Sequence, residues 1–188
     1  KVAKILPDIA VKFSAGVYQN EATTMDYGFR HMNNDSLRVP RVYRFFTHGH
    51  FFDMPIGYIV MEFVPGVTLE KYDVGSELME RIARAVNHLS TLPIPSSQGP
   101  GPVYGGMPRG YLWSDYGAYT SFASLRDMET WLNQRLDICR QPARFSLNST
   151  ELLFAHMDIA RRNIILTTEG DLCFIDWAHS GFYPRSFQ

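Results

Sequence analysis

The sequence predicts an α+β fold that divides into a small strand-rich part, residues 1–63, and a larger, more helical part, residues 64–188. Strand-length apolar segments crowd the first third of the chain, where a single helical pattern interrupts them. The segment Val64-Pro65-Gly66 then breaks the pattern, and beyond it apolar residues recur at helical spacings of three and four. A length of 188 residues suits one domain or a small pair of lobes.

The first part opens with a predicted β-hairpin. Its strands are Val2–Leu6 and Ile9–Phe13, and the turn between them is Pro7-Asp8, a dipeptide typical of turns. Lys12 therefore falls near the end of the second strand.

A helix and two further strands complete the first part. Asn20 is expected to cap a helix that runs to about Met32, with Glu21 in its first turn. After the helix come two strands with a loop between them: Val42–Thr47, the loop His48-Gly49-His50, and Tyr58–Phe63.

The second part contains two predicted helices, separated by a long loop. Ser76 is expected to cap the first helix, whose apolar residues are Leu78, Ile82, Val86 and Leu89. The loop, residues 93–110, is rich in proline and glycine and long enough to suggest a functional cover or a mobile segment. Ser124 and Asp127 form a capping box for the second helix, which carries apolar residues as far as Leu136. Short strands then follow at Leu152–Ala155, Asn163–Thr167 and Leu172–Ile175.

Composition excludes several classes of protein. The 18 basic residues nearly cancel the 19 acidic ones, and a net charge of −1 argues against sequence-independent binding of nucleic acid. The longest apolar runs are strand-sized and fall short of the ~20 residues of a membrane span, so no membrane partner is expected. Two cysteines without metal-ligand spacing exclude a disulfide scaffold and favour the cytoplasm.

The most informative motif is His156-Met-Asp158-Ile-Ala-Arg-Arg-Asn163, which leaves one strand and is followed by a hairpin that ends at Asp176. Phosphoryl transfer from a nucleotide needs one carboxylate to orient the attacking hydroxyl and accept its proton. It also needs a second carboxylate and an amide oxygen to hold Mg²⁺ against the phosphates. Asp158 fits the first role, and Asn163 and Asp176 fit the second.

A purely structural interpretation of the same residues is possible. Asp158 would cap a turn, Asn163 would close a loop, and His156 would be a buried, hydrogen-bonded histidine. The spacing of the motif and the second strand that ends in aspartate favour the catalytic interpretation.

These motifs resemble the protein-kinase-like fold and, within it, the aminoglycoside phosphotransferase family of small-molecule kinases, especially its fungal members. The resemblance rests on the catalytic-loop segment His156–Leu166 and on the ending Ile175–Pro184, in which Asp176-Trp177 stands in place of the Asp-Phe-Gly of protein kinases. The segment Tyr58–Gly66 resembles the hinge between the two lobes. Residues 72 to 150 match only loosely. The resemblance implies that residues 1–63 and 64–188 are the smaller and the catalytic lobe.

The resemblance also implies roles for further residues. The hinge backbone at Met61, Glu62 and Phe63 would pair with adenine, so these residues are expected to bind ATP. Lys12 would contact the α- and β-phosphates, and Glu21 would hold that lysine in place. The alternatives are an ordinary lysine at a strand edge and a favourable charge at a helix N-terminus.

The chain departs from the family pattern in places. Only eleven residues precede Lys12, and no glycine-rich phosphate loop occurs among them. Met157 stands where the family usually has glycine, and family members continue beyond the position of Gln188 with helices that build the acceptor pocket. We therefore expect the 188 residues to be the core of a larger kinase domain, truncated at both ends.

The resulting hypothesis is ATP-dependent, Mg²⁺-assisted phosphorylation of a hydroxyl group on a small molecule. Asp158 would act as the base, since it already occupies the proton-accepting position, and His156 would orient the loop. A protein kinase is the enzyme alternative, although no activation segment follows Asp176-Trp177. A nucleotide-binding pseudokinase or scaffold is the alternative without catalysis.

Other residues carry weaker signals. His48 and His50 lack a third metal ligand at sensible spacing, which favours a polar loop. Arg162 and its neighbour Arg161 could steady phosphate charge or form a solvated loop. The cluster Trp113, Tyr116 and Tyr119 could line an acceptor pocket or pack beneath the long loop.

Overall fold

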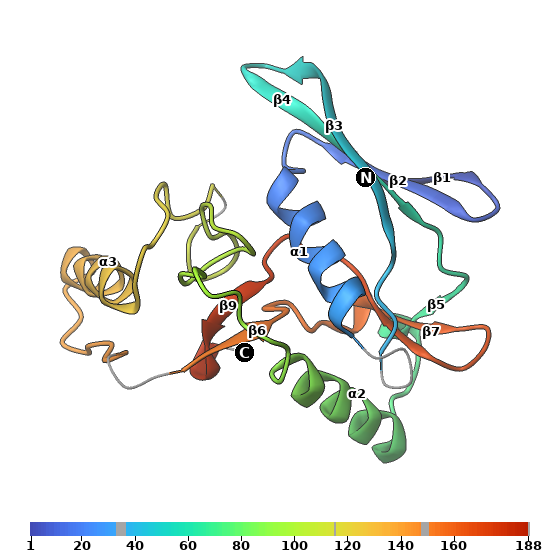
Figure 1. The fold of residues 1–188 in the computed structure, drawn as a ribbon. Coiled ribbons are helices and arrows are strands. Elements are labelled where there is room, and N and C mark those ends of the chain that lie inside the picture. The colour runs from blue at the N-terminus through green and yellow to red at the C-terminus, as the bar shows by residue number, and fades with distance from the viewer. Residues whose placement is uncertain (33–36, 115, 148–150, 188) are drawn as a thin grey trace.

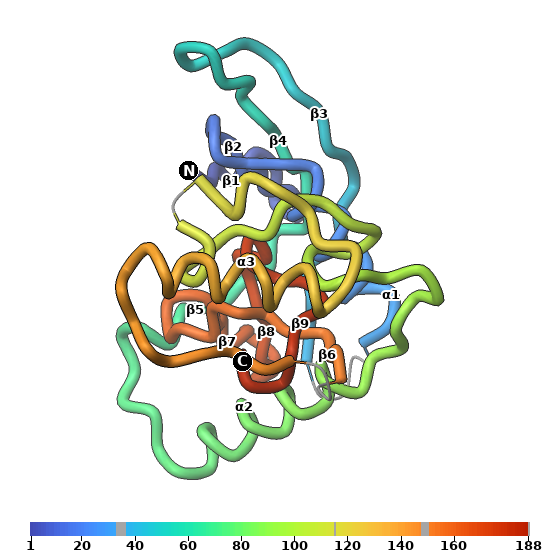
Figure 2. The backbone as a smooth tube through the Cα atoms, turned by 90° about the vertical axis from the view of Figure 1, so that its left-hand side faces the viewer, coloured from blue at the N-terminus to red at the C-terminus, as the bar shows by residue number. Residues whose placement is uncertain are grey.

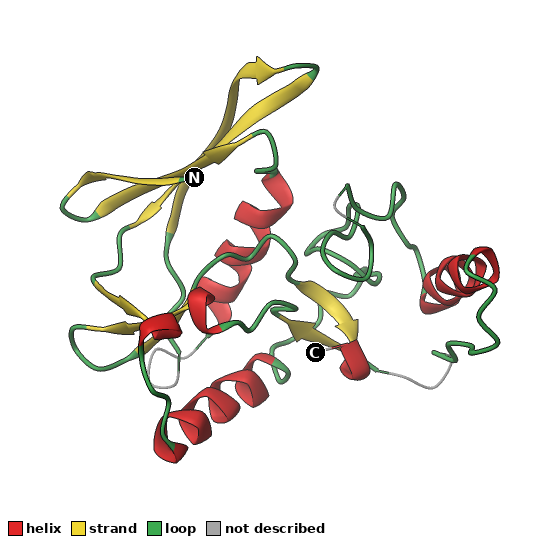
Figure 3. Ribbon diagram, turned by 180° about the vertical axis from the view of Figure 1, so that it is seen from behind, coloured by secondary structure: helices red, strands yellow, loops and turns green. Residues whose placement is uncertain are grey.

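The computed structural model describes residues 1–32, 37–114, 116–147 and 151–187. Gln188, at which the predicted second part ends, lies outside the described residues. One antiparallel sheet stands over a body of helices, loops and two smaller sheets, with the chain order shown by the colours of Figure 1. Both views of the ribbon show the helix of the first part lying between the large sheet and this body (Figures 1 and 3).

The large sheet has the strand order β1-β2-β4-β3, and every pairing in it is antiparallel. Its strands are β1 (Val2–Leu6), β2 (Ile9–Ser14), β3 (Val42–Phe51) and β4 (Met54–Glu62). The predicted first hairpin is confirmed. The pairing of its second strand, β2, with β4 places Lys12 opposite Ile59. Lys12 is thereby fixed on a strand with partners on both sides.

The second hairpin is longer than predicted. His48 and His50 were expected in a loop, but both lie within β3, near the tip of a hairpin that projects away from the body (Figure 1). Gly49 has φ 72° and interrupts the pairing, whose register shifts between Thr47 and His50. A glycine with positive φ inside a strand indicates a bulge, which explains why a turn pattern occurs in mid-strand.

Helix α1 (Gln19–His31) packs against the rest of the chain on several sides. Its N-cap is Tyr18, without a side-chain capping bond, so the predicted cap at Asn20 is wrong. The ring of Tyr27 contacts the rings of Phe154 and Phe182 at centroid distances of 5.4 and 5.7 Å. A Cβ at Gly28 would lie 3.3 Å from the Trp177 ring, so a small residue at this position allows the close approach. Helix α1 is thus positioned directly against the segment that carries the catalytic motif.

Two more α-helices lie in the second part. Helix α2 (Ser76–Leu89) begins after Gly75, so the predicted cap at Ser76 is one residue out. Helix α3 (Leu125–Ile138) begins as predicted, with the Ser124 side chain accepting a bond from the backbone N–H of Asp127. Helix α3 lies to one side of the molecule, away from α1 and α2 (Figure 1). No helix among the described residues is long and apolar enough to cross a membrane.

Five short strands form the two remaining sheets. β5 (Gly66–Thr68), β7 (Ile164–Thr167) and β8 (Leu172–Phe174) pair in the order β5-β7-β8, and β6 (Leu152–Ala155) pairs with β9 (Gly181–Pro184). Strands β5 and β9 were not predicted from the sequence. Figure 2 shows the short strands between the large sheet at the top and α2 at the bottom. β6 ends at Ala155 and β7 begins at Ile164, so one short sheet holds each end of the segment that carries the predicted catalytic motif.

The hydrophobic core has two centres. One joins α1, α2 and the sheets, and its fully buried side chains include Phe154, Phe174 and Trp177. The other joins α3 to β9 through Trp113 and Tyr183, whose rings lie 6.1 Å apart. Since β9 contributes to both centres, the body packs as one unit.

The connection from α1 to β3 is attached to the small sheet. Arg38 forms a parallel bridge with Cys173, and its N–H donates to the carbonyl of Leu172 at 2.8 Å. Cys173 is a completely buried free thiol, and burial raises its pKa to about 12. The other free cysteine, Cys139, is exposed at the end of α3.

Candidate active site

The loop between β6 and β7 presents Asp158 as a carboxylate with defined hydrogen-bond partners. The Asn163 side chain donates through Nδ2 to Asp158 Oδ2 at 2.8 Å and to its backbone carbonyl at 3.1 Å. Arg162 donates from one nitrogen to both carboxylate oxygens, at 2.9 and 2.8 Å. A short 3₁₀ helix over Arg161–Asn163 makes these contacts possible by turning the two donors back toward Asp158. The Asp158 side chain is 12% exposed, so this carboxylate is held firmly and remains accessible.

His156 lies behind this loop and is fully buried. Its Nε2 donates to the carbonyl of Ile175 at 3.1 Å, and its own carbonyl accepts a bond from Ser180 Oγ at 2.9 Å. Burial lowers the pKa of His156 to about 4, so the imidazole is neutral at pH 7. Its contacts connect the loop of Asp158 to the segment of Asp176, which makes it a positioning residue.

Lys12 joins the large sheet, helix α1 and the segment after β8. Its Nζ lies 2.6 Å from Glu21 Oε1 and 2.8 Å from Asp176 Oδ1. Burial opposes the charge of Lys12, but the two carboxylates outweigh it and raise the pKa of the lysine. Burial also opposes ionisation of Asp176, and the Lys12 ammonium overcomes it to lower the pKa of that carboxyl. The result is a charged pair in the lining of a cavity.

This cavity of about 210 Å³ brings together most of the residues predicted to bind a nucleotide and a metal. Of the predicted site residues, its lining includes Lys12, Glu21, Met61, Glu62, Phe63, Asn163 and Asp176. The structure therefore assembles seven predicted residues from five separate segments. It places His156 behind this cavity, and Asp158 adjoins it through its hydrogen bond with Asn163.

The predicted hinge has its polar groups partly engaged within the protein. The Glu62 carboxylate accepts bonds from the Arg38 guanidinium and from the backbone N–H of Arg41. The backbone N–H groups of Glu62 and Phe63 donate to the carbonyls of Arg41 and Asp8. In this structure, therefore, both backbone N–H groups are hydrogen-bonded within the protein.

The donor set of the cavity suits Mg²⁺. Among the described residues, no group of three histidine, cysteine, aspartate or glutamate side chains could hold a metal ion. Mg²⁺ is commonly held in such sites by one or two protein oxygen ligands, with water and substrate phosphates completing the shell. Asp176 offers a carboxylate, and Asn163 turns its Nδ2 toward Asp158, which leaves its carbonyl oxygen directed elsewhere. These two residues fit the ion by the chemistry of their donors.

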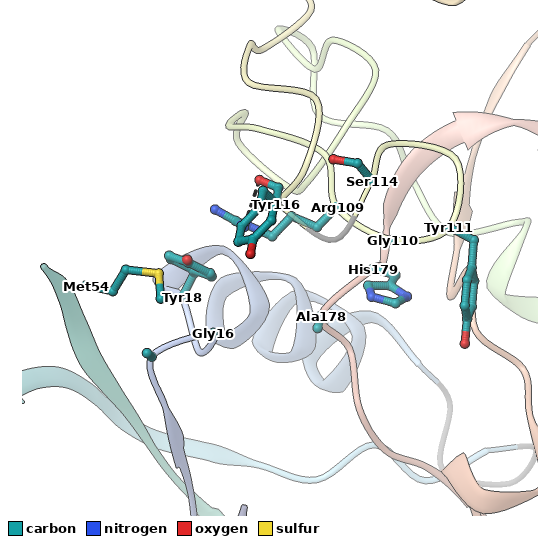
Figure 4. Close-up of a pocket in the computed structure, with 11 residues that line it drawn as sticks. Gly16, Tyr18, Met54, Arg109, Gly110, Tyr111, Ser114, Tyr116, Ala178 and His179 are labelled. Atoms are coloured by element: carbon teal, nitrogen blue, oxygen red, sulfur yellow. Dashed lines mark hydrogen bonds between the residues drawn. The ribbon is translucent and has the colours of Figure 1, made fainter. Parts of the chain in front are cut away.

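A second cavity, of about 410 Å³, was not predicted from the sequence. It lies between the turn before α1 and the loop around residue 110, and Figure 4 shows its lining. Tyr18, Arg109, Tyr111, Tyr116 and His179 contribute its larger polar and aromatic side chains. Of the aromatic cluster noted in the sequence, Tyr116 lines this cavity, whereas Trp113 and Tyr119 line another cavity of about 340 Å³.

The arrangement of these residues can be compared with that of known proteins. The family model described as the APH phosphotransferase enzyme family matches residues 8–187 of the chain. The chain belongs to this family. No curated protein resembles this chain closely enough to match.

Solved structures share the fold of this chain. Aminoglycoside phosphotransferase APH(4)-Ia has a TM-score of 0.55 at 16% identity, over 93% of this chain and 60% of that chain. Spectinomycin phosphotransferase APH(9)-Ia, in complex with ADP and spectinomycin, has a TM-score of 0.51 at 14% identity, over 94% of this chain and 58% of that chain. The likeness confirms the predicted kinase-like α+β fold. The chain spans about 60% of the length of these two structures.

Proposed function

We propose that this protein transfers the γ-phosphate of ATP to a hydroxyl group of a small molecule. The observation that carries the proposal is the assembly of Lys12, Asn163 and Asp176 around one cavity, with Asp158 beside it. Two of the similar structures support the choice of nucleotide and acceptor: APH(9)-Ia was solved with ADP and spectinomycin, and an APH(4)-Ia variant with AMP-PNP and hygromycin B. In this proposal residues 1–63 and 64–188 are the two lobes.

Asp158 would orient the acceptor hydroxyl and accept its proton. A carboxylate has about four lone-pair sites. Arg162 and Asn163 use three of them, so one site is left for a substrate hydroxyl. The bonds that occupy the other sites hold the carboxylate in a fixed orientation, and such positioning supplies much of the catalysis in phosphoryl transfer.

Lys12 would contact the phosphates of the nucleotide, and Glu21 would hold it in place. The 2.6 Å contact between them fixes the ammonium at the mouth of the cavity where Asp176 also lies. When bound between Asn163 and Asp176, Mg²⁺ would neutralise charge on the phosphates. His156 would keep the segments of Asp158 and Asp176 in register without touching the reacting atoms. We place the enzyme in the cytoplasm, in keeping with its two free thiols.

Paired variants test this proposal. Asp158→Asn should lower the rate of phosphate transfer by about 100-fold or more, the typical contribution of a general base, because the amide cannot accept the proton. Its affinity for Mg-ADP should stay within about twofold of wild type, because Asp158 lies outside the nucleotide cavity. Asp176→Ala should instead lose the thermal stabilisation by Mg-ADP, which is about 2.7 kcal/mol at a hundredfold excess over Kd. Asp73→Asn, an exposed carboxylate on another surface, is the control.

Transfer is best measured by mass spectrometry of a pool of hydroxyl compounds incubated with ATP and Mg²⁺. Wild-type turnover by Asp158→Asn would contradict the assignment of the base. Binding of Mg-ADP by the wild type, with no phosphate transferred to any compound, would favour the nucleotide-binding pseudokinase. Phosphorylation of peptides in place of small molecules would favour a protein kinase.

A further inference from the structure

The adjacent arginines of the catalytic motif, Arg161 and Arg162, make different contacts. The Nε of Arg161 donates to the Leu69 carbonyl at 3.2 Å. The Nη2 of Arg162 donates to the two carboxylate oxygens of Asp158, at 2.9 and 2.8 Å, and to the Tyr111 hydroxyl at 3.2 Å. Both arginines are exposed, but it is Arg162 that brings its charge to the candidate base.

The guanidinium of Arg162 also has donors that the protein does not use. Every nitrogen of a guanidinium carries N–H groups. Within the described part of the chain, Nε and Nη1 of Arg162 form no hydrogen bond, because all of its contacts are made by Nη2. The side chain is 48% exposed. Donors beside Asp158 are therefore open to a ligand.

Asn163 connects this group to the nucleotide cavity. Its side chain donates to Asp158 at 2.8 Å, and it lines the cavity of about 210 Å³ together with Lys12 and Asp176. Arg162 is thus next in sequence to a residue of the cavity, and both residues bind the same carboxylate. A phosphate that passes from the cavity to a hydroxyl on Asp158 approaches Arg162 as well.

Phosphate transfer places negative charge close to the Asp158 carboxylate. In the proposed reaction the bond between the γ-phosphorus and ADP breaks, a bond to the acceptor oxygen forms, and the hydroxyl proton passes to Asp158. The attacking oxygen lies about 3 Å from its base and about 3 Å from the phosphorus. Phosphate oxygens therefore come close to a carboxylate of like charge, and a cation is needed to offset the repulsion.

Of the two cations in the candidate site, Arg162 is the better placed for this task. Lys12 is held between Glu21 and Asp176, at 2.6 and 2.8 Å, in the lining of the nucleotide cavity. Arg162 already lies against Asp158 and has unused donors. A guanidinium keeps its charge at all ordinary pH values, and its planar set of donors matches two phosphate oxygens.

We propose that Arg162 is a further catalytic residue, which binds oxygens of the transferring phosphate through Nε and Nη1 while Nη2 stays on Asp158. The proposal rests on the proposed function for the identity of the phosphate donor. It assigns different roles to the two arginines, since Arg161 contacts the Leu69 carbonyl instead.

Calorimetric titration with Mg-ADP and Mg-AMP-PNP tests this contact, because the second nucleotide carries a γ-phosphoryl group and the first does not. Arg162→Gln should keep the affinity for Mg-ADP within about twofold and lower the preference for Mg-AMP-PNP by about tenfold, because hydrogen bonds from a charged group are lost. Arg162→Lys keeps the charge without the paired donors and should lower the preference by about threefold. Arg161→Gln, the exposed neighbour, should leave it unchanged.

The same titrations in an Asp158→Asn background separate a direct contact from an indirect one. If Arg162 did no more than neutralise Asp158, its replacement would have no effect once that carboxylate is an amide. A direct contact with the phosphate predicts a loss of about tenfold in this background too.

An unchanged preference in Arg162→Gln would overturn the proposal, and so would an equal loss in Arg161→Gln or the absence of any loss in the Asp158→Asn background. Binding of Mg-ADP shows that a variant is folded, and Arg162→Lys decides the matter if Arg162→Gln does not bind it. All these outcomes leave the proposed function intact. A wild-type protein that binds neither nucleotide would instead contradict the proposed function, and the role of Arg162 with it.

Discussion

Met157 and Asp176 both adopt left-handed backbone conformations, with φ of 65° and 64°. In residues other than glycine this conformation is sterically unfavourable by about 1 kcal/mol, and residues that adopt it concentrate at functional sites. The conformation at Met157 gives a physical reason for the glycine that the related phosphotransferases usually carry at this position. In this chain the Met157 side chain packs against the centre of the core formed around Trp113 and Tyr183, a contact that glycine could not make.

His156 makes the stability of the protein depend on pH. Its pKa is about 4 in the folded chain against an ordinary value of 6.5, since burial disfavours the imidazolium. Its contribution to stability is therefore present above pH 6.5 and is lost as the pH falls toward 4. Through this residue alone, the free energy of unfolding should fall by about 2 kcal/mol between pH 7 and pH 5.

Urea unfolding at the two pH values measures this change. His156→Gln keeps a side-chain donor for the Ile175 carbonyl and cannot titrate, so its loss of stability on acidification should be smaller by that amount. His50→Gln, an exposed change on β3, should behave as the wild type does. An identical pH dependence in His156→Gln and wild type would show that this histidine does not titrate as its burial requires.

At the scale of elements, strand β9 depends on a close contact with the long loop of residues 93–110. Phe182 and Gly101 exchange two backbone hydrogen bonds, of 2.9 and 2.8 Å. A Cβ at Gly181 would lie 2.2 Å from the Gly101 carbonyl oxygen, much closer than two such atoms can approach. The long loop of the second part is therefore attached by its backbone to the sheet that carries the catalytic motif.

Gly181→Ala should destabilise the protein by about 2 kcal/mol or more, because backbone must move to admit the methyl group. Gly16→Ala is the matched control, since a methyl group there would meet only Ser14 Oγ at an ordinary 3.7 Å. Thermal unfolding of the two variants should show a large and a small change in Tm. Equal melting temperatures for both would mean that the loop and β9 are not packed so closely.

The sequence predicted most elements whose pattern is local. The first hairpin, β6 and the Ser124 cap of α3 lie where the patterns place them. Strands β5 and β9 were missed because each begins with a glycine and β9 ends with a proline, residues that locally indicate a turn or a break. The ends of α1 and α2 were misplaced because tertiary packing, without a side-chain cap, sets where these helices begin.

The distinction between local sequence patterns and long-range packing also applies to the candidate site. Lys12, Glu21, Asn163 and Asp176 could be placed together because each stands in a motif of fixed order, and the structure brings them to one cavity. Arg109 could not, because nothing around it in the sequence predicts the path of its loop. Its position beside Tyr18 depends on long-range packing that joins the loop to the turn before α1.

At the scale of the whole molecule, three connections join the large sheet to the body. They are helix α1, the Lys12–Asp176 ion pair and the bridge between Arg38 and Cys173. All three connections involve residues that line the smaller cavity or adjoin it, because Glu21 of α1, Lys12 and Asp176 line it and β8 ends two residues before Asp176. Ligand binding in this cavity should therefore stabilise the attachment of the two parts to each other.

The two cysteines provide a way to observe that attachment by thiol labelling. A maleimide reagent at pH 7 should modify Cys139 within minutes, whereas Cys173 is buried and its pKa of about 12 leaves almost no reactive thiolate. In a Cys139→Ser variant, the slow second reaction would report how often the Arg38 segment separates from β8. Mass spectrometry should show this reaction slowed by Mg-ADP. An unchanged rate would mean that the segment opens independently of the nucleotide cavity. The Cys173 thiol would thus report chemically on the separation of the Arg38 segment from β8.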